Sequence, residues 1–257
     1  RERQNFVYGN EEEGVPGCIK NGIDEATANK IYDEMIDFAK YAFNKSHAAA
    51  YAVVSYQTAY LKYYYPVEFM AALLTSVIDN SGKVAEYIYS CRQMGIQILP
   101  PDINKSVGTF SVENGNIRFG LTAIKSVGRP VIQAIIEERN ERGEFKHLKD
   151  FIERMGGREV NKRTIENFIK AGVFDSLGGT RKQFMMIYIQ IMDQVNQERK
   201  YSMTGQMSLF DLVDDEQKKE FEIPLPKVGE YEKENKLAFE KEVLGVYLTG
   251  HPLEDYE

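Results

Sequence analysis

The sequence has 257 residues, of which 43% are hydrophobic and 28% charged, with a net charge of −7. This is the composition of a folded globular protein and excludes an intrinsically disordered chain. The longest apolar run is 48–54, far short of the roughly 18 residues of a membrane span, so no membrane partner is expected. Two cysteines and three scattered histidines exclude a disulfide framework, disfavour a zinc site and fit a reducing cytoplasm.

The N-terminal half is predicted to be helical. Residues 1–17 combine several glycines with a run of glutamates, which predicts a loop or the frayed edge of a chain cut from something longer, since it begins with Arg1. Asp24 is a suitable N-cap for an amphipathic helix over 25–41. Residues 48–64 are rich in alanine and tyrosine and nearly uncharged, which predicts a buried helix that ends before Pro66. Pro66 is expected in the first turn of a third helix over 67–78, and a fourth helix is expected over 83–94, closed by Gly95.

A minor β patch and more helices are predicted next. Short β-branched segments indicate an antiparallel patch with a hairpin turn at Asn114-Gly115-Asn116; they are 96–99, 109–112 and 117–119. The helices expected after it are 123–125, 130–142, 148–155, 162–170 and 181–199. Residues 200–236 have few apolar runs and resemble a linker, and 237–248 forms a final helix or strand. The fold class is mainly α with a small antiparallel β patch.

The charge is distributed unevenly along the chain. Residues 118–182 hold 14 lysines and arginines against 9 acidic residues, a net +5, whereas 1–117 carries −4 and 183–257 carries −8. Because salt screens charges over about 8 Å, a local basic island can bind phosphates although the whole chain is acidic. A solvated surface with clustered charges is the alternative.

Two segments of this island have the form of a helix-hairpin-helix. In 121–136 a short helix is followed by a tight turn and a second helix, whose N-terminal amides and dipole can hold a phosphate. The residues expected to contact DNA there are Lys125, Ser126, Val127, Gly128 and Arg129. Residues 161–178 repeat this arrangement, with Lys162 and Arg163 at the start of the first helix and Ala171, Gly172 and Val173 as the hairpin. Ordinary helical hairpins with glycine C-caps are the alternative; two in tandem favour duplex binding without sequence specificity.

Two further motifs are candidates for binding. Lys45, Ser46 and His47 precede the alanine- and tyrosine-rich helix, where they could grip a triphosphate while Tyr51 stacks on a base. Alternatively Ser46 is an N-cap, Lys45 is solvated and the tyrosines pack in a core. Gln206, Met207, Ser208, Leu209 and Phe210 form a short apolar motif in the linker, typical either of a docking peptide or of an anchor on its own domain.

Catalytic machinery is absent from the sequence. There is no strand-borne pair of aspartates for two Mg²⁺ ions, no P-loop and no nucleophile elbow. We therefore expect no catalytic residue, no metal site and no activity of the chain alone.

Several blocks resemble bacterial DNA polymerase III alpha subunits, the C-family replicative polymerases. They run in the family's order along the whole chain: 43–51 (FNKSHAAAY), 55–58 (SYQT), 65–72 (YPVEFMAA), 98–104 (ILPPDIN), 171–178 (AGVFDSLG) and 244–252 (LGVYLTGHP). The resemblance implies that 1–115 is the C-terminal part of the fingers and 116–200 a tandem helix-hairpin-helix domain. Residues 201–257 would then be a linker toward an OB-fold domain that lies outside the chain.

The resemblance also implies roles for the motifs. The Lys45-Ser46-His47 block would face the incoming nucleotide, and 206–210 would bind the sliding clamp. The catalytic aspartates would lie in the palm outside this chain, so Mg²⁺ and deoxynucleoside triphosphate serve the parent enzyme, which works with other replisome subunits in the cytoplasm. Two rival hypotheses are a free-standing DNA-binding adaptor and a clamp-binding module without DNA affinity.

Overall fold

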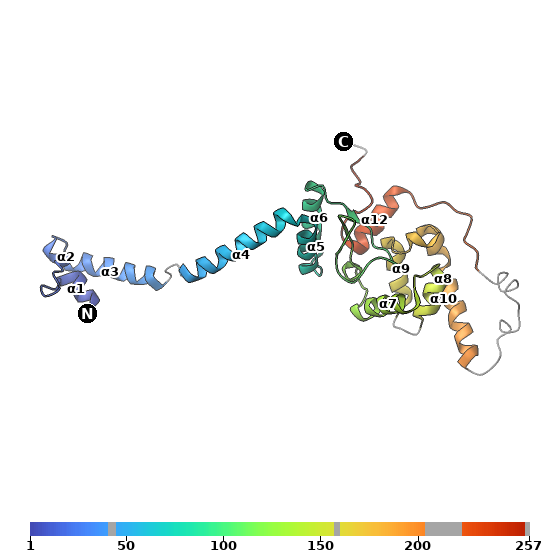
Figure 1. The fold of residues 1–257 in the computed structure, drawn as a ribbon, viewed down its shortest axis with the longest axis horizontal. Helices are drawn as coiled ribbons and strands as arrows, with labels where there is room; N and C mark the ends of the chain where they lie inside the picture. The colour runs from blue at the N-terminus through green and yellow to red at the C-terminus, as the bar shows by residue number, and fades with distance from the viewer. Residues whose placement is uncertain (41–44, 157–159, 204–222, 255–257) are drawn as a thin grey trace. The chain divides into compact units, whose positions relative to one another are not determined.

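The computed structural model describes residues 1–40, 45–156, 160–203 and 223–254, without the side chains of 201–203. The backbone divides into two compact units, Arg1–Tyr60 and Leu61–Glu257. Their boundary falls within helix α4 (Lys45–Tyr64; Figure 1). None of the described helices is long and apolar enough to cross a membrane.

The prediction of a loop over 1–17 holds only for 9–16 and is wrong for residues 2–8, which form a helix. Helix α1 (Glu2–Tyr8) is joined to the short α2 (Gly17–Lys20) by a turn in which Asn10 and Val15 pair their backbones in both directions, at 2.8 and 2.9 Å. Gly9 and Gly17 both have positive φ, and a Cβ on Gly17 would overlap the backbone of Gly9. The glycines that suggested a loop are what lets two helices approach closely.

Helix α3 (Glu25–Lys40) begins as predicted. The Asp24 carboxylate accepts the backbone N–H of Thr27 at 3.0 Å and its hydroxyl at 2.6 Å. These bonds satisfy one of the amides that the first turn of a helix leaves without a partner. They also lower the pKa of Asp24.

The prediction that 48–64 is buried is wrong as well. Helix α4 has no buried residue, and Tyr56 and Tyr63 are 69% and 78% exposed. A helix that is apolar on all sides needs cover from several other elements. The described part of this chain does not provide it, and composition alone cannot reveal that.

The second unit opens with two helices and a sheet. Helix α5 (Pro66–Ser76) has Pro66 in its first turn as predicted, and α6 (Ser81–Gln93) is followed by Gly95 with φ +74. The strands are β1 (Ile98–Leu99), β2 (Ser111–Glu113) and β3 (Asn116–Arg118), in the order β1-β3-β2.

The sheet is mixed rather than wholly antiparallel. Strands β2 and β3 pair antiparallel through the predicted turn, where Asn114 and Gly115 have φ of 51° and 76°. Strand β1 pairs with β3 in parallel. The chain reverses once between β1 and β2 and again in the β2–β3 hairpin, so β3 runs in the same direction as β1. The buried Arg118 fixes this corner, with two bonds of 2.7 Å to Glu113 and one of 2.7 Å to the carbonyl of Pro100.

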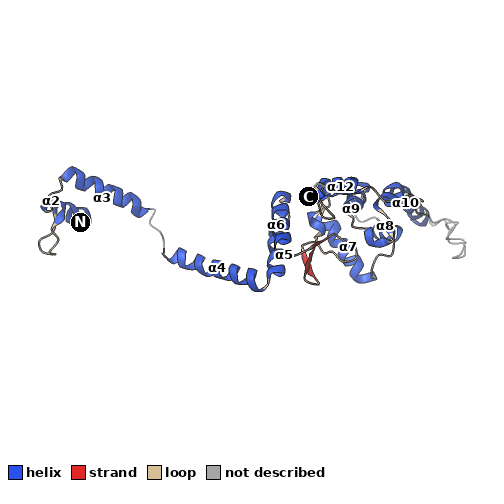
Figure 2. Cartoon of the chain, turned by 90° about the horizontal axis from the view of Figure 1, so that it is seen from above, coloured by secondary structure: helices blue, strands red, loops and turns tan. Residues whose placement is uncertain are grey.

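The remaining elements are mainly helices (Figure 2). In chain order they are the 3₁₀ helix η1 (Leu121–Ala123), α7 (Arg129–Arg142), α8 (Leu148–Met155), α9 (Lys162–Ala171), the 3₁₀ helix η2 (Asp175–Leu177), α10 (Arg181–Met203) and α12 (Lys233–Leu244). The predicted helix over 123–125 is thus a 3₁₀ turn placed two residues earlier. The segment expected over 237–248 is a helix that starts at Lys233.

One hydrophobic core extends through the second unit from α5 to the residues after α12. At its centre Phe151 is fully buried and contacts Phe145, Phe168 and Phe174, with ring centroids 5.1, 6.4 and 5.0 Å away. The contacts with Phe145 and Phe168 are edge-to-face and that with Phe174 is tilted, and such aromatic pairs add to the stabilisation from burial. The predicted division between 115 and 116 falls in the β2–β3 turn inside this unit, and the functional assignment of the three segments stays a prediction.

Candidate nucleic-acid interface

The first predicted hairpin is an exposed turn between η1 and α7. Ser126 adopts φ +62, which lets the chain reverse, and Val127 below it is only 8% exposed. Lys125, Gly128 and Arg129 are exposed around the turn. The apolar residue anchors the hairpin in the core while its neighbours face solvent.

Two distant helices hold this turn in place. The backbone N–H of Lys125 donates to the carbonyl of Val243 on α12 at 2.9 Å, and its carbonyl accepts the side-chain amide of Asn167 on α9 at 2.8 Å. The Lys125 ammonium also donates to the carbonyl of Glu242, at 2.9 Å. The turn is therefore rigidly placed, as a site that acts through its backbone requires.

The N-terminus of α7 has the chemistry of an anion site. No side chain caps it, and Pro130 occupies its first turn, so the amides of Arg129 and Val131 have no carbonyl within the helix to bond. Gly128 precedes them with φ −73, and a Cβ there would meet only Pro130 Cδ at 3.6 Å. The fold therefore does not require glycine at position 128. Because Gly128 has no side chain, a phosphate can approach the amides at the start of α7.

Folding neutralises part of the basic island. Arg129 pairs with Asp79 at 2.9 Å, both largely exposed, and Lys162 pairs with Asp193 at 3.3 Å. Lys170 pairs with Glu242 from α12 at 2.8 Å. Carboxylates from 1–117 and 183–257 thus pair with basic side chains of 118–182. The net charge of +5 counted over 118–182 therefore overstates the positive charge at its surface.

The assignment of Ala171, Gly172 and Val173 as the second DNA-contacting hairpin is wrong in its position. All three are buried. Gly172, with φ +78, is the left-handed residue that ends α9, and the carbonyl of Val173 accepts the N–H of Ile103 at 2.9 Å. A Cβ on Gly172 would overlap the guanidinium of Arg181. These residues close a helix and fill the core, so no backbone phosphate reaches them.

The exposed second turn lies a few residues further on. Ser176-Leu177-Gly178 repeats the pattern of Ser126-Val127-Gly128, with Leu177 8% exposed and its two neighbours at the surface. Helix α10 begins at Arg181, three residues after Gly178, whereas α7 begins directly after Gly128; Gly178 has φ +80 and Gly128 has φ −73. The repeated Ser-apolar-Gly triplet is the sequence signal that would have located it.

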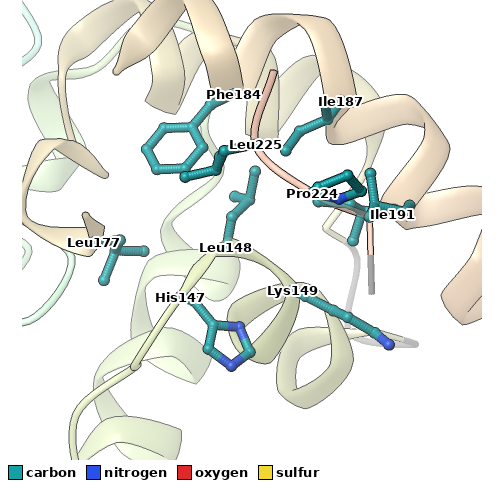
Figure 3. Close-up of a pocket in the computed structure, with 10 residues that line it drawn as sticks. His147, Leu148, Lys149, Leu177, Phe184, Ile187, Ile191, Pro224 and Leu225 are labelled. Atoms are coloured by element: carbon teal, nitrogen blue, oxygen red, sulfur yellow. The ribbon is translucent and has the colours of Figure 1, made fainter. Parts of the chain in front are cut away.

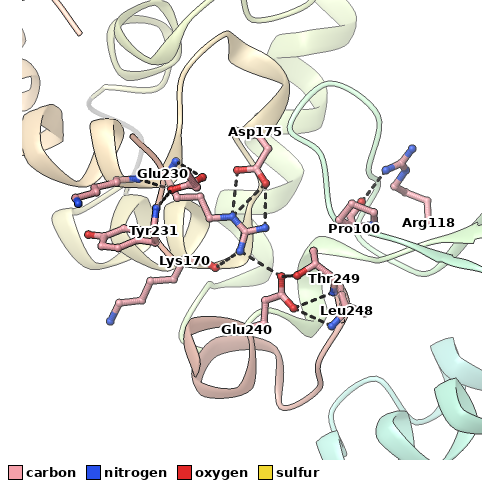
Figure 4. Close-up of polar contacts among 11 residues, drawn as sticks. Pro100, Arg118, Lys170, Asp175, Glu230, Tyr231, Glu240, Leu248 and Thr249 are labelled. Carbon is pink, nitrogen blue, oxygen red and sulfur yellow. Dashed lines mark hydrogen bonds and ion pairs between the residues drawn. The ribbon is translucent and has the colours of Figure 1, made fainter. Parts of the chain in front are cut away.

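A buried ionic cluster joins the second turn to α12 (Figure 4). Arg181, 1% exposed, donates to Asp175 at 2.9 Å, to Glu240 at 3.2 Å and to the carbonyl of Lys170 at 3.2 Å. Burial lowers the pKa of Arg181, but Asp175 and Glu240 outweigh it, and its pKa is raised. Glu240 also accepts the Leu248 and Thr249 amides at 2.8 and 3.1 Å, which gives the 244–252 block a structural role.

The predicted nucleotide-binding residues all lie on α4. Lys45, Ser46 and His47 form its first turn, and Tyr51 follows one turn later, with its ring 4.4 Å from that of His47. All four are exposed. The helix therefore brings His47 and Tyr51 together, whereas Lys45 and Ser46 occupy other positions around its exposed first turn. The predicted clamp-binding residues 206–210 lie outside the described residues.

An apolar cavity in the second unit lies beside α10. It measures about 360 Å³. Its walls come from α8, α10, the second turn and the segment that leads to α12 (Figure 3); the residues are His147, Leu148, Lys149, Leu177, Phe184, Ile187, Ile191, Ile223, Pro224 and Leu225. Within the described ranges no three histidine, cysteine or acidic side chains gather where they could hold a metal ion.

The chain is similar in sequence to a known structural motif and to several known proteins. A helix-hairpin-helix motif model matches residues 95–184, the range that holds both turns. The chain is 45% identical over 241 residues to the DNA polymerase III subunit alpha of Vibrio cholerae, which is 93% of this chain and 21% of that protein. It is 43% identical to the same subunit of Thermus aquaticus, over 100% of this chain and 20% of that protein. For Mycobacterium tuberculosis (strain ATCC 25618 / H37Rv) the subunit is 43% identical over 92% of this chain and 20% of that protein.

The chain thus spans about a fifth of the length of the curated relatives it matches. Over that fifth it is similar to one contiguous part of them, and a recognised helix-hairpin-helix lies within it.

Proposed function

We infer that the chain is a segment of a bacterial DNA polymerase III alpha subunit, a DNA-directed DNA polymerase, and that it holds the backbone of duplex template-primer DNA. The observation that carries this is the uncapped N-terminus of α7 behind the exposed, rigidly held turn of 125–129. Backbone amides at a helix start bind phosphate oxygens of any sequence, so the contact positions the duplex without reading bases. Similarity along the whole chain to alpha subunits supports this over a free-standing adaptor.

We assign the finer division by the same resemblance. Residues 1–115 would belong to the fingers, 116–200 to the DNA-holding domain, and 201–257 to the linker toward an OB-fold domain. The DNA-contacting residues are Lys125, Ser126, Gly128 and Arg129, with Lys162 and Arg163 at the start of α9. A replicative role places the parent enzyme among other replisome subunits in the cytoplasm.

We propose that the start of α4 forms one wall of the incoming-nucleotide site. Lys45 would offset charge on the triphosphate, and the adjacent, tilted His47 and Tyr51 rings would offer a face to a base. In the complete polymerase, Lys45→Ala is expected to raise the KM for nucleotide by about tenfold, the loss of one charge-assisted contact. An unchanged KM would remove Lys45 from the site.

Mg²⁺ does not fit the described residues. Phosphoryl transfer by two metal ions needs clustered carboxylates, and the described ranges hold no such cluster. We propose that Mg²⁺ and the reacting phosphates are held by other parts of the parent enzyme.

We propose that 206–210 is a sliding-clamp peptide. Its apolar pair, Leu209 and Phe210, would fill a pocket on the clamp, and tethering would raise the local concentration of DNA to the millimolar range. Replacing both by alanine is expected to weaken clamp binding at least about thirtyfold, because buried anchors carry most of such an interface. Surface plasmon resonance on immobilised clamp measures this; DNA binding should not change, and unaltered clamp affinity would contradict the assignment.

A salt titration of DNA binding tests the main proposal. Fluorescence anisotropy of a labelled duplex is followed with the full 257-residue chain at increasing salt. We expect binding that prefers duplex to single-stranded DNA and a slope of log K against log salt of about −0.9 per neutralised phosphate. Absence of binding even at low salt would contradict the proposal.

A further inference from the structure

The two hairpins present their second helices differently. Both have a buried apolar residue in the turn and an exposed glycine after it, at Val127 and Gly128 and at Leu177 and Gly178. Both lead into long helices, of 14 and 23 residues. No side chain caps the start of α7. At the start of α10 the N–H of Gln183 donates to the Thr180 hydroxyl at 3.2 Å and the N–H of Thr180 to the Gln183 side chain at 2.9 Å, so the amides of Arg181 and Lys182 are those that a phosphate could use.

A carboxylate already occupies the start of α10. Glu230 accepts the N–H of Arg181 at 3.1 Å and the N–H of Lys182 at 3.1 Å, and also the N–H of Tyr231 at 2.7 Å. Burial raises the pKa of Glu230, but these three donors outweigh it, and its pKa lies below the ordinary value. Glu230 therefore stays ionised, and Figure 4 shows it with Tyr231 beside the helix start.

The segment that carries Glu230 is attached along α10. The side-chain amide of Gln183 donates to the carbonyl of Pro226 at 2.8 Å. Pro224 and Leu225 close one side of the cavity against Phe184 and Ile191 (Figure 3). The ammonium of Lys182 lies 5.8 Å from the ring centroid of Tyr231. The carboxylate is thus delivered to the helix by a segment 48 and 49 residues away in sequence.

We propose that Glu230 is an internal competitor for a DNA phosphate at the second hairpin. Its two oxygens take the amides of Arg181 and Lys182 that a phosphodiester would otherwise accept. While the 223–231 segment is docked, the duplex is held by the first hairpin alone; when Glu230 leaves, the second hairpin adds a phosphate contact. This inference rests on the proposed DNA-binding function and adds to it a means by which the chain itself limits the number of phosphate contacts.

The test compares two variants with the same change of charge. Glu230→Gln removes the carboxylate from α10, and Glu232→Gln removes one from an exposed residue that caps no helix with its side chain. In the duplex titration, Glu230→Gln is expected to raise affinity at least about threefold at low salt and to steepen the salt slope by about 0.9, one more phosphate. Glu232→Gln should leave the slope unchanged.

A double variant separates this inference from the proposed function. Gly128→Glu closes the first hairpin, and adding Glu230→Gln to it should restore measurable duplex binding through the second. If Glu230→Gln and Glu232→Gln behave alike and the double variant does not recover, Glu230 is only a helix cap and the competition is refuted. If neither the wild type nor any of the variants binds duplex DNA, the proposed function itself fails. A lower thermal midpoint with no gain in affinity also refutes the competition.

Discussion

Arg181→Ala is expected to lower the free energy of unfolding of the second unit by about 3–5 kcal/mol. The side chain is 1% exposed and joins Asp175, Glu240 and the end of α9. Removing it leaves the Glu240 carboxylate, itself 1% exposed, without its cation, and opens a void against Gly172. Because the loss of one partner leaves a buried charge uncompensated, the cost is far larger than that of a surface pair.

Urea denaturation followed by circular dichroism measures this effect. Arg129→Ala is the matched control, since it also breaks an Arg–Asp pair, but one with side chains 69% and 77% exposed. Its cost should be within about 1 kcal/mol, because water screens such pairs. A cost for Arg181→Ala as small as that of the control would mean that the cluster is not what joins the second turn to α12.

Gly128→Glu is expected to weaken duplex binding at least about tenfold at low salt and to reduce the salt slope by about 0.9, one phosphate. The carboxylate would lie beside the amides that open α7 and would repel the phosphate they attract. The fold should tolerate it, because φ at this position is −73 and a Cβ meets only Pro130 Cδ at 3.6 Å. A loss of duplex binding by this variant would therefore reflect the changed surface of the first hairpin and not a loss of stability.

The same anisotropy titration measures this loss. Gln190→Glu adds the same charge at an exposed position within α10 and serves as the control. Both variants should keep the thermal midpoint of the wild type. Equal affinity of Gly128→Glu and Gln190→Glu would show that the first hairpin does not contact the phosphates.

Local signals in the sequence predicted local structure well. The Asp24 cap, the Pro66 helix start, Gly95 after α6 and the Asn114-Gly115 turn are all present because each depends on a few neighbouring residues. The mainly α class and the helix-hairpin-helix are confirmed for the same reason, since helical periodicity and turn residues can be identified from short windows. Glycine-rich stretches were less informative, because a glycine that permits close packing looks like one in a loop.

What a segment packs against could not be predicted in the same way. The exposure of α4, the burial of Ala171 to Val173 and the parallel pairing of β1 depend on elements far along the chain. The prediction of the DNA-contacting site was affected most, because its second hairpin was placed at Gly172, the residue that ends α9. Charge was misleading too, since the acidic flanks fold back onto the basic island.

The sequence by itself determined most of the helices after residue 24, several of their caps and the presence of two hairpins, because these follow from backbone preferences within a few residues. Only the tertiary structure decided which hairpin is open. Glu230 reaches the start of α10 from 49 residues away, and Glu240 reaches Arg181 from 59. Contacts at such separations are selected by the packing of the whole core, and that is why the availability of a helix start to phosphate is a property of the folded chain.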